Sequence, residues 1–337
     1  MQPVRLGIVG PGLIWRNAHE PAIRQLDAFR VSALCARSDA SQEWAAASYP
    51  DVPFYRDYRE MVVSPGIDAV VVLTPIPMNA PVAMAALQAG KDVLLEKPMA
   101  RTLDEGRSLL DAVRTSSMKL WVLEQFAYGC RARRIAEILQ SGQIGNVVLS
   151  DMVNHSWFDP AKHSVRGYGS TAWRINPEFI LGTLFDGGHH PLALQAQLFG
   201  EPAWVDATGA SLRDAYGDYD HVLTHSYYDS GMQSVFSHAS HLGGQRNYWH
   251  IRGTDGLLSV YRDRIETERN DGGKTVEPAP RNDMTLSMWQ SFADCFESGT
   301  EPIYGPTCAF RELRTLHAID LALRTGQRVS PIESTDR

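Results

Sequence analysis

The chain has 337 residues, of which 44% are hydrophobic and 21% charged, and its formal net charge is −7 at pH 7. This composition excludes a disordered or fibrous protein, and the acidic balance argues against nucleic acid and anionic membranes as partners, which leaves a small molecule as the expected partner. Two domains are expected, because single hydrophobic cores seldom grow beyond about 250–300 residues.

The cysteines and the N-terminus bear on the compartment. Cys35, Cys130, Cys295 and Cys308 are scattered without a C-x-x-C pair, which is typical of reduced thiols in the cytosol. The chain runs directly into a strand-like segment without a basic and apolar leader, and no segment approaches the roughly 20 apolar residues of a membrane helix. We therefore expect a cytoplasmic protein without a disulfide framework.

Residues 1–125 alternate short runs of Val, Ile and Leu with helical patterns. The helical pattern before the fourth run has Asn79 as its expected N-cap and Gly90 as its expected end. Strands buried on both faces are predicted at 4–9, 31–34, 69–73, 93–95 and 120–123. This alternation predicts a parallel, doubly wound sheet, so we assign 1–125 to a dinucleotide-binding Rossmann domain.

Residues 126–337 follow a different pattern. A long strand is predicted at 147–158, and 221–240 predicts a hairpin with its turn at Asp229–Gly231. The remaining predicted elements are a surface loop at 270–283 and helices at 131–140, 189–200, 285–299 and 307–326. Consecutive strands without alternating helices predict a second, α+β domain, an open-faced and largely antiparallel sheet with helices on one face.

The segment Gly-Pro-Gly-Leu-Ile-Trp at 10–15 has the first two glycines of the G-x-G-x-x-G fingerprint, while Trp15 replaces the third. Gly10 and Gly12 would serve the tight turn and the approach of phosphate to the backbone, whereas the third glycine serves helix packing. An accidental Gly-Pro-Gly turn is the alternative. The strand before the segment and the helical pattern after it favour a cofactor turn.

The tip of the second predicted strand carries Ala36, Arg37 and Ser38. An acidic residue here binds the ribose 2′-hydroxyl of NAD, whereas an arginine accommodates the 2′-phosphate of NADP. Arg37 and Ser38 therefore predict NADP(H) in preference to NAD(H). The alternative is that Arg37 is a solvated surface charge and that Asp39 takes the acidic role.

Two clusters suggest chemistry. Glu96, Lys97 and Pro98 follow the fourth predicted strand at the edge where doubly wound sheets bind ligands, and a partly desolvated lysine there can exchange protons. A surface Glu-Lys pair is the alternative. Asp186 and His190 are four residues apart at the start of a predicted helix, so the carboxylate could orient the imidazole. Alternatively, Asp186 is simply an N-cap.

Taken together, these motifs resemble the Gfo/Idh/MocA family of oxidoreductases. The resemblance covers nearly the whole chain, and its most specific elements are A-G-K-x-V-x-x-E-K-P at 89–98 and D-x-G-x-H at 186–190. Leu-Thr-Pro at 73–75 and Trp173-Arg174 add to it. The resemblance implies a Rossmann domain, a second domain for substrate binding and oligomerisation over 126–337, a carbohydrate-like substrate, and a homo-oligomer, either dimer or tetramer.

The resemblance also implies roles for residues. Lys97 would hold and polarise the reacting oxygen, His190 would take or return its proton, and Asp186 would orient or contact the substrate while hydride is exchanged with nicotinamide C4. A cis Lys97–Pro98 bond is implied as well, and Trp173 and Arg174 are further predicted substrate contacts. The predicted cofactor contacts are Gly10, Gly12, Leu13, Ile14, Arg37, Ser38, Thr74, Pro75, Asn79, Glu96 and Lys97.

The chain departs from the family pattern at Ile76 and Asn79, where an asparagine and a histidine are usual, and at Ala193, the last position of D-x-G-x-H-x-x-D. His189 is an extra histidine that could share the role of His190. A metal site is not predicted. In particular, His238 and a histidine three residues later would point to opposite faces of a strand.

The expected function is an NAD(P)-dependent dehydrogenase or reductase that acts on CH–OH groups. Two alternatives share the fold: a non-catalytic dinucleotide-binding sensor and a redox-neutral, NAD-dependent glycosidase. The intact Lys97 and His190 argue against the sensor, and Arg37 with Ser38 argues against the NAD-based glycosidase.

Overall fold

The computed structural model describes residues 2–156, 165–242 and 247–332, and the chain divides into two compact units. Unit 1 comprises Met1–Tyr128 and Asp283–Leu313, and unit 2 comprises Gly129–Asn282 and Arg314–Arg337. Residues 283–313 thus belong with the N-terminal part of the chain, whereas the sequence pattern placed all of 126–337 in one domain. Each unit is described by itself below.

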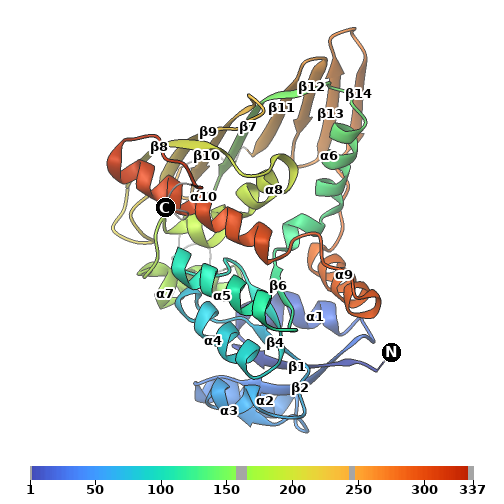
Figure 1. Ribbon diagram of the computed structural model, residues 1–337, viewed down its shortest axis with the longest axis vertical. Helices are drawn as coiled ribbons and strands as arrows, with labels where there is room; N and C mark the ends of the chain where they lie inside the picture. Colours follow the sequence, from blue (N-terminus) through green and yellow to red (C-terminus); the bar gives the residue numbers. More distant parts are fainter. Residues whose placement is uncertain (1, 157–164, 243–246, 333–337) are drawn as a thin grey trace. The chain divides into compact units, whose positions relative to one another are not determined.

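Unit 1 is built on a six-stranded parallel sheet with the order β3-β2-β1-β4-β5-β6, of which Figure 1 labels β1, β2, β4 and β6. This is a doubly wound order, which confirms the predicted Rossmann architecture. The strands are β1 (Val4–Val9), β2 (Phe29–Cys35), β3 (Phe54–Tyr55), β4 (Ala69–Val72), β5 (Asp92–Glu96) and β6 (Leu120–Leu123). Only β3 was not predicted from the sequence. Both β4 and β6 are buried along their whole length, as parallel strands covered on two faces should be.

The helices of unit 1 follow the strands. They are η1 (Trp15–His19), α1 (Glu20–Ile23), α2 (Asp39–Ser48), α3 (Tyr58–Val62), α4 (Ile76–Gln88), α5 (Leu103–Thr115), η2 (Gln125–Tyr128) and α9 (Met284–Ser298), together with the first residues of α10 (Pro306–Thr325). A capping box starts α5: Thr102 accepts from the Glu105 N–H, and the Glu105 carboxylate accepts from the Thr102 N–H.

The prediction that Asn79 caps a helix was wrong. Helix α4 begins one turn earlier, at Ile76, and Pro75 occupies the N-cap position. Asn79 lies inside the helix with no exposed surface, because its side-chain amide bonds to backbone carbonyls of the loop after β5. The predicted helix end is confirmed, since Gly90 follows α4 in the left-handed region with φ +72°.

Aromatic packing explains why residues 283–313 join unit 1. Trp289 of α9 packs edge-on against Phe29 of β2, with ring centroids 5.1 Å apart. Phe296 of the same helix lies 4.5 Å from Trp121 of β6. Both tryptophans are fully buried. Helix α9 therefore supplies large apolar side chains to the core of the Rossmann sheet.

Unit 2 is built on an eight-stranded sheet with the order β14-β13-β12-β11-β7-β10-β9-β8. All neighbouring strands are antiparallel except β7 and β10, which confirms the predicted, largely antiparallel sheet. The strands are β7 (Val147–His155), β8 (Trp204–Ala210), β9 (His221–Tyr227), β10 (Gln233–Ala239), β11 (Tyr248–Gly253), β12 (Gly256–Val260), β13 (Arg264–Arg269) and β14 (Lys274–Pro278). The predicted hairpin is β9–β10, with Gly231 at φ +85° in its turn.

Helices pack on one face of this sheet. Ile135 and Ile138 of α6 form a buried cluster with Trp249 and Ile251 of β11, and Leu198 of α8 packs against it. The helical elements of unit 2 are α6 (Cys130–Gln140), η3 (Val165–Ser170), α7 (Ala172–Ile175), η4 (Leu184–Gly188), α8 (His190–Phe199) and the remainder of α10. Over the described ranges, no helix combines the length and hydropathy that a membrane span requires.

The prediction of a loop over 270–283 was wrong in part. Residues 274–278 form β14, which pairs with β13 at the edge of the sheet. Four of its five residues are exposed, so the strand lacks the alternation of apolar and polar residues that marks a half-buried strand. The predicted strand at 147–158 is β7, which ends at His155, and its last two positions lie outside the described residues.

Candidate functional site

The glycine turn after β1 has the geometry that a phosphate-binding turn needs. Gly10 has φ +84°, and a Cβ there would lie only 2.5 Å from the carbonyl oxygen of Leu73. A Cβ on Gly12 would meet nothing closer than 3.9 Å, so open space lies over its backbone. Gly10 therefore allows the close passage beside β4, and Gly12 leaves the backbone accessible to an anion.

Trp15 stands where the fingerprint has its third glycine, and its side chain lies in the core of unit 1. It is the first residue of the π-helical turn η1, and its side chain has no exposed surface. The neighbouring Arg16 donates from Nε to the Pro11 carbonyl at 3.0 Å, and its guanidinium lies 4.2 Å from the Trp44 ring centroid. Arg16 thus stabilises the glycine turn through its hydrogen bond to the Pro11 carbonyl. Leu13 is partly exposed, and Ile14 is half-buried.

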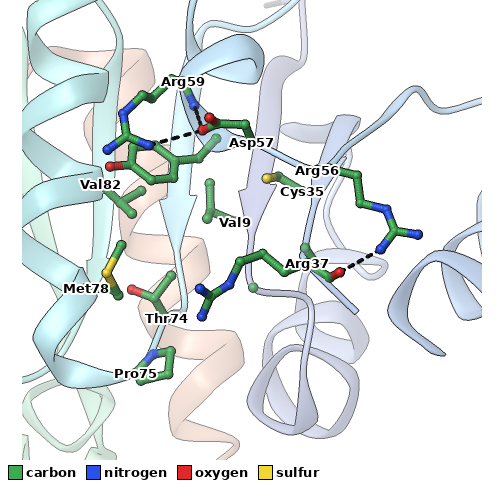
Figure 2. Close-up of a pocket in the computed structure, with 13 residues that line it drawn as sticks. Val9, Cys35, Arg37, Arg56, Asp57, Arg59, Thr74, Pro75, Met78 and Val82 are labelled. Atoms are coloured by element: carbon green, nitrogen blue, oxygen red, sulfur yellow. Dashed lines mark hydrogen bonds and ion pairs between the residues drawn. The ribbon is translucent and has the colours of Figure 1, made fainter. Parts of the chain in front are cut away.

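A cavity of about 370 Å³ opens at the carboxyl ends of β1, β2 and β4 (Figure 2). Four predicted cofactor contacts line it, and Figure 2 shows the Arg37 side chain extending toward Thr74 and Pro75. Its full lining is Val9, Gly10, Cys35, Ala36, Arg37, Arg56, Asp57, Tyr58, Arg59, Thr74, Pro75, Met78 and Val82. Apolar walls with a cationic rim fit the adenosine half of a dinucleotide.

Part of this lining was missed by the sequence analysis. Arg56, Asp57, Tyr58 and Arg59 follow β3, which has only two residues and leaves no periodic signal. Without that strand, nothing in the sequence placed these residues at the carboxyl edge of the sheet. Asp57 caps α3 by accepting from the Arg59 N–H at 2.9 Å, and the Arg59 guanidinium lies over the Tyr58 ring.

The other residues at the tip of β2 have different environments. Ser38 is the N-cap of α2 and accepts from the Ser41 N–H at 3.2 Å, and it does not line the cavity. The Asp39 carboxylate accepts from Arg56 and is likewise absent from the lining. Burial, reinforced by the nearby carboxylates, raises the pKa of the Cys35 thiol to about 11, so this cysteine stays protonated at the cavity wall.

The loop after β5 presents Lys97. The Lys97–Pro98 bond is cis, as the family resemblance implied. Asn79 donates from its amide to the carbonyls of Glu96 at 3.1 Å and Pro98 at 3.0 Å, and its own carbonyl accepts from Thr74 at 2.9 Å. The backbone on both sides of Lys97 is therefore fixed by one buried side chain.

The Glu96 carboxylate is bound from within the unit. One oxygen accepts from the backbone N–H of Lys97 at 2.9 Å, and the other lies 3.1 Å from Nε2 of His19. Nδ1 of His19 lies 3.0 Å from Nε1 of Trp289. An indole N–H can only donate, so His19 accepts at Nδ1 and donates from Nε2 to Glu96. This network joins η1, β5 and α9, and it was missed because no spacing rule connects residues so far apart in the sequence.

Replacing His19 with alanine is expected to lower the free energy of unfolding by about 2–4 kcal/mol. His19 is 2% exposed and Glu96 7% exposed, so the change removes one hydrogen-bond partner from a buried carboxylate and the acceptor from the buried Trp289 N–H. Trp289→Phe keeps a smaller ring against Phe29 but removes the N–H and part of a fully buried indole, so it should also cost about 2–3 kcal/mol. Urea unfolding followed by circular dichroism measures both. A wild-type midpoint for His19→Ala would contradict the network.

In unit 2 the structure brings Asp186, Arg174 and Trp173 together. Nε of Arg174 donates to Oδ2 of Asp186 at 2.7 Å, and Nη2 lies 3.4 Å from Oδ1. The guanidinium carbon lies 4.0 Å from the centroid of the Trp173 ring. Arg174 therefore fixes the direction of the Asp186 carboxylate by a two-pronged contact.

His190 is the first residue of α8, and His189 alone separates it from η4, which contains Asp186. The N-cap of α8 is His189, so the alternative that Asp186 caps this helix was wrong. The His189 and His190 rings lie 4.7 Å apart, but His189 is fully buried whereas His190 is half-buried. Of the two histidines, His190 is the one that solvent reaches. Lys97 belongs to unit 1, and the other predicted catalytic residues belong to unit 2.

Comparisons with known protein families cover both units. Residues 4–124 match the model of an oxidoreductase family with an NAD-binding Rossmann fold. Residues 132–259 match the model of the GFO/IDH/MocA C-terminal domain. The first match contains the glycine turn, the residues that line the cavity, and Lys97. The second contains Trp173, Arg174, Asp186 and His190.

Individual proteins are also similar to this chain. It is 30% identical over 266 residues to an uncharacterized protein from Saccharomyces cerevisiae, covering 77% of this chain and 74% of that protein. It is 26% identical over 259 residues to scyllo-inositol 2-dehydrogenase (NADP(+)) from Bacillus subtilis, covering 77% and 69%. A crystal structure of an oxidoreductase from Thermotoga maritima, 25% identical, superposes with a TM-score of 0.89 over 98% of this chain and 99% of that one.

Proposed function

The chain belongs to the Gfo/Idh/MocA family of oxidoreductases, and we propose that it is a dehydrogenase or reductase that prefers NADP(H). Its substrate is a hydroxyl or carbonyl group of a sugar, a polyol or a related compound. The observation that carries the proposal is Lys97, which follows a parallel strand at its carboxyl end in a loop fixed by Asn79 and Glu96. The similarity to a relative named scyllo-inositol 2-dehydrogenase (NADP(+)) supports the substrate class and the cofactor.

The residues of unit 1 fit a nicotinamide dinucleotide. The open backbone at Gly12, at the start of the first helical turn, would receive the pyrophosphate. The cavity beside Thr74 and Pro75 would hold the adenosine half, and the Arg37 guanidinium would pair with the 2′-phosphate. When bound, the cofactor supplies or accepts hydride at nicotinamide C4.

The proposed mechanism assigns one task to each side chain. Lys97 donates a hydrogen bond from Nζ to the reacting oxygen and stabilises the negative charge that develops on it. His190 takes the hydroxyl proton in the oxidation direction and returns it in the reduction direction. Asp186, held by Arg174, accepts hydrogen bonds from substrate hydroxyls. The Arg174 guanidinium covers one face of the Trp173 ring, and the rest of the ring would contact the C–H groups of a sugar.

Arg37→Ala is expected to weaken NADPH binding by about 10- to 100-fold and NADH binding by less than about threefold, because only NADPH carries the phosphate that pairs with this guanidinium. Titration by nicotinamide fluorescence or calorimetry measures both affinities. Arg30→Ala, an exposed arginine at the other end of the same strand, is the matched control and should change neither affinity. Equal losses for the two cofactors would contradict the assignment of Arg37.

The activity itself is tested by a screen of sugars and polyols with NADP⁺ and NAD⁺ in parallel. A change in nicotinamide absorbance that depends on the substrate supports the proposal. Product formed without a net change in absorbance would indicate the redox-neutral glycosidase instead. If neither nicotinamide cofactor binds to the purified protein, the proposal fails.

A further inference from the structure

Asp39 lies two residues beyond Arg37 in the sequence and contacts Arg56, and both of these arginines line the cavity. A free carboxylate in this neighbourhood repels a 2′-phosphate and attracts the ribose hydroxyls of NAD. In this protein the carboxylate is occupied: Oδ1 of Asp39 lies 2.6 Å from Nη2 of Arg56, and the same nitrogen donates to the side chain of Gln42. The Asp39 carboxylate, whose side chain is 86% exposed, is thus paired with a residue that the sequence analysis did not consider.

Arg56 also holds the strand tip that carries Arg37. Its Nη1 donates to the backbone carbonyl of Arg37 at 2.6 Å, and Figure 2 shows this bond while the Arg37 side chain runs away from it toward Thr74. A planar guanidinium can serve a carboxylate and a carbonyl at once, because its N–H groups form a rigid fork. One side chain therefore fixes both the backbone of Arg37 and the charge of Asp39.

The three arginines of the cavity are not equivalent. Arg56 is paired with Asp39, and Arg59 lies 3.5 Å from the carboxylate of Asp57. In the described part of the chain, Arg37 is the only one of the three whose guanidinium is paired with no carboxylate. The full positive charge that a 2′-phosphate would meet is therefore that of Arg37.

We propose that Arg56 is a specificity-determining residue for the cofactor: it pairs with the Asp39 carboxylate and so keeps the cavity selective for the 2′-phosphate. The inference rests on the proposed function, because it concerns how the NADP(H) preference is maintained. Arg56 acts through Asp39 rather than by its own contact with the phosphate. Its effect should accordingly depend on whether residue 39 carries a charge.

The test is a double-mutant cycle read out by binding alone. Arg56→Met, Asp39→Asn and the double variant are titrated by calorimetry with 2′,5′-ADP and with 5′-AMP, which differ only in the 2′-phosphate. Arg56→Met is expected to weaken 2′,5′-ADP binding by about 5- to 10-fold and 5′-AMP binding by less than about twofold. In the Asp39→Asn background the same change should weaken 2′,5′-ADP binding by less than about twofold.

Arg59→Met is the matched control, because it removes another arginine from the same cavity. Its effect on 2′,5′-ADP binding should be the same whether residue 39 is aspartate or asparagine. Arg56 and Asp39 are both substantially exposed, so their variants should fold, and circular dichroism checks this. An equal effect of Arg56→Met in both backgrounds overturns the inference.

Failure of the inference can be distinguished from failure of the proposed function. If the unmodified protein binds 2′,5′-ADP no more tightly than 5′-AMP, the preference for NADP(H) is wrong. If it does discriminate, and Arg56→Met discriminates equally well, the preference stands and only the role of Arg56 is wrong.

Discussion

Lys97→Met is expected to lower turnover by about 10²- to 10⁴-fold while leaving the affinity for NADPH within about threefold of the wild type. Methionine keeps the length and the apolar stem of the side chain but removes the ammonium that would polarise the reacting oxygen. Because Asn79 and Glu96 fix the backbone on either side, the methionine side chain should leave the backbone at the same place as the lysine. The measurement is kcat with a substrate found in the screen, together with a fluorescence titration of NADPH.

The control for this prediction is Lys274→Met, which makes the same change on the edge strand β14. Lys274 is half-exposed and lies beside Glu266 and Glu268, so turnover should remain at the wild-type level. If Lys97→Met keeps more than about a tenth of the wild-type turnover, Lys97 does not have the proposed role. Retention of biological function by this variant would favour the non-catalytic sensor.

Acidification should destabilise unit 2 through His238. This histidine lies on β10, is 4% exposed, and contacts Thr183 through Nε2 at 3.2 Å. Burial lowers its pKa to about 3, and the charges of His155 and His221 contribute further. A histidine in the unfolded chain titrates near pH 6.5. Between pH 6.5 and about pH 3, this histidine is therefore protonated in the unfolded chain but neutral in the folded protein.

The sign and size of the effect follow from this difference. The contribution of neutral His238 to the free energy of unfolding is present in full above about pH 6.5, and it is lost as the pH falls toward about 3. At pH 4.5 the loss is about 2–3 kcal/mol, since each pH unit below 6.5 costs roughly 1.4 kcal/mol. The His238 imidazole packs directly on Gly188, since a Cβ on that glycine would lie only 2.5 Å from the ring. Gly188 belongs to η4, so a charge on His238 would also disturb the element that carries Asp186.

Urea unfolding of the wild type and His238→Gln at about pH 8, 6 and 4.5 tests this prediction. Glutamine cannot be protonated, so the stability difference between the two proteins should shift by about 2–3 kcal/mol in favour of the variant as the pH falls. Thr183→Val removes the hydrogen bond but keeps the imidazole, so it should follow the wild-type pH dependence. Parallel curves for the wild type and His238→Gln would show that another group dominates.

The sequence predicted those parts of the fold that leave a periodic signal. The range predicted for β1, 4–9, is the observed one, because its last four residues, 6–9, lack polar side chains and are buried throughout. The two residues of β3 and the exposed β14 leave no such signal, so they were not predicted. Missing β3 also hid Arg56, because nothing then placed the loop after β3 at the cavity.

The residues of the candidate site likewise divide into those that a local sequence motif marks and those that only the tertiary fold brings together. Gly10, Arg37 and Lys97 were predicted as site residues because each belongs to a motif with a fixed spacing after a strand. Asn79 resembles a helix cap in the sequence, but its amide is used to bind the carbonyls of the Lys97 loop, a role that depends on the tertiary fold. The contact between His19 and Trp289 joins residues at opposite ends of the chain, and no local pattern predicts it.

The membership of α9 in unit 1 has a consequence for biosynthesis. When Tyr128 leaves the ribosome, the sheet of unit 1 has all its strands but lacks α9, so Phe29 and Trp121 have no ring partners from that helix. At about 5–20 residues per second, synthesis of the chain up to Leu313 takes on the order of 10–40 s more. The nascent protein therefore carries an uncovered aromatic surface during this time, which is a target for chaperones. A fragment truncated after residue 128 would keep that surface permanently.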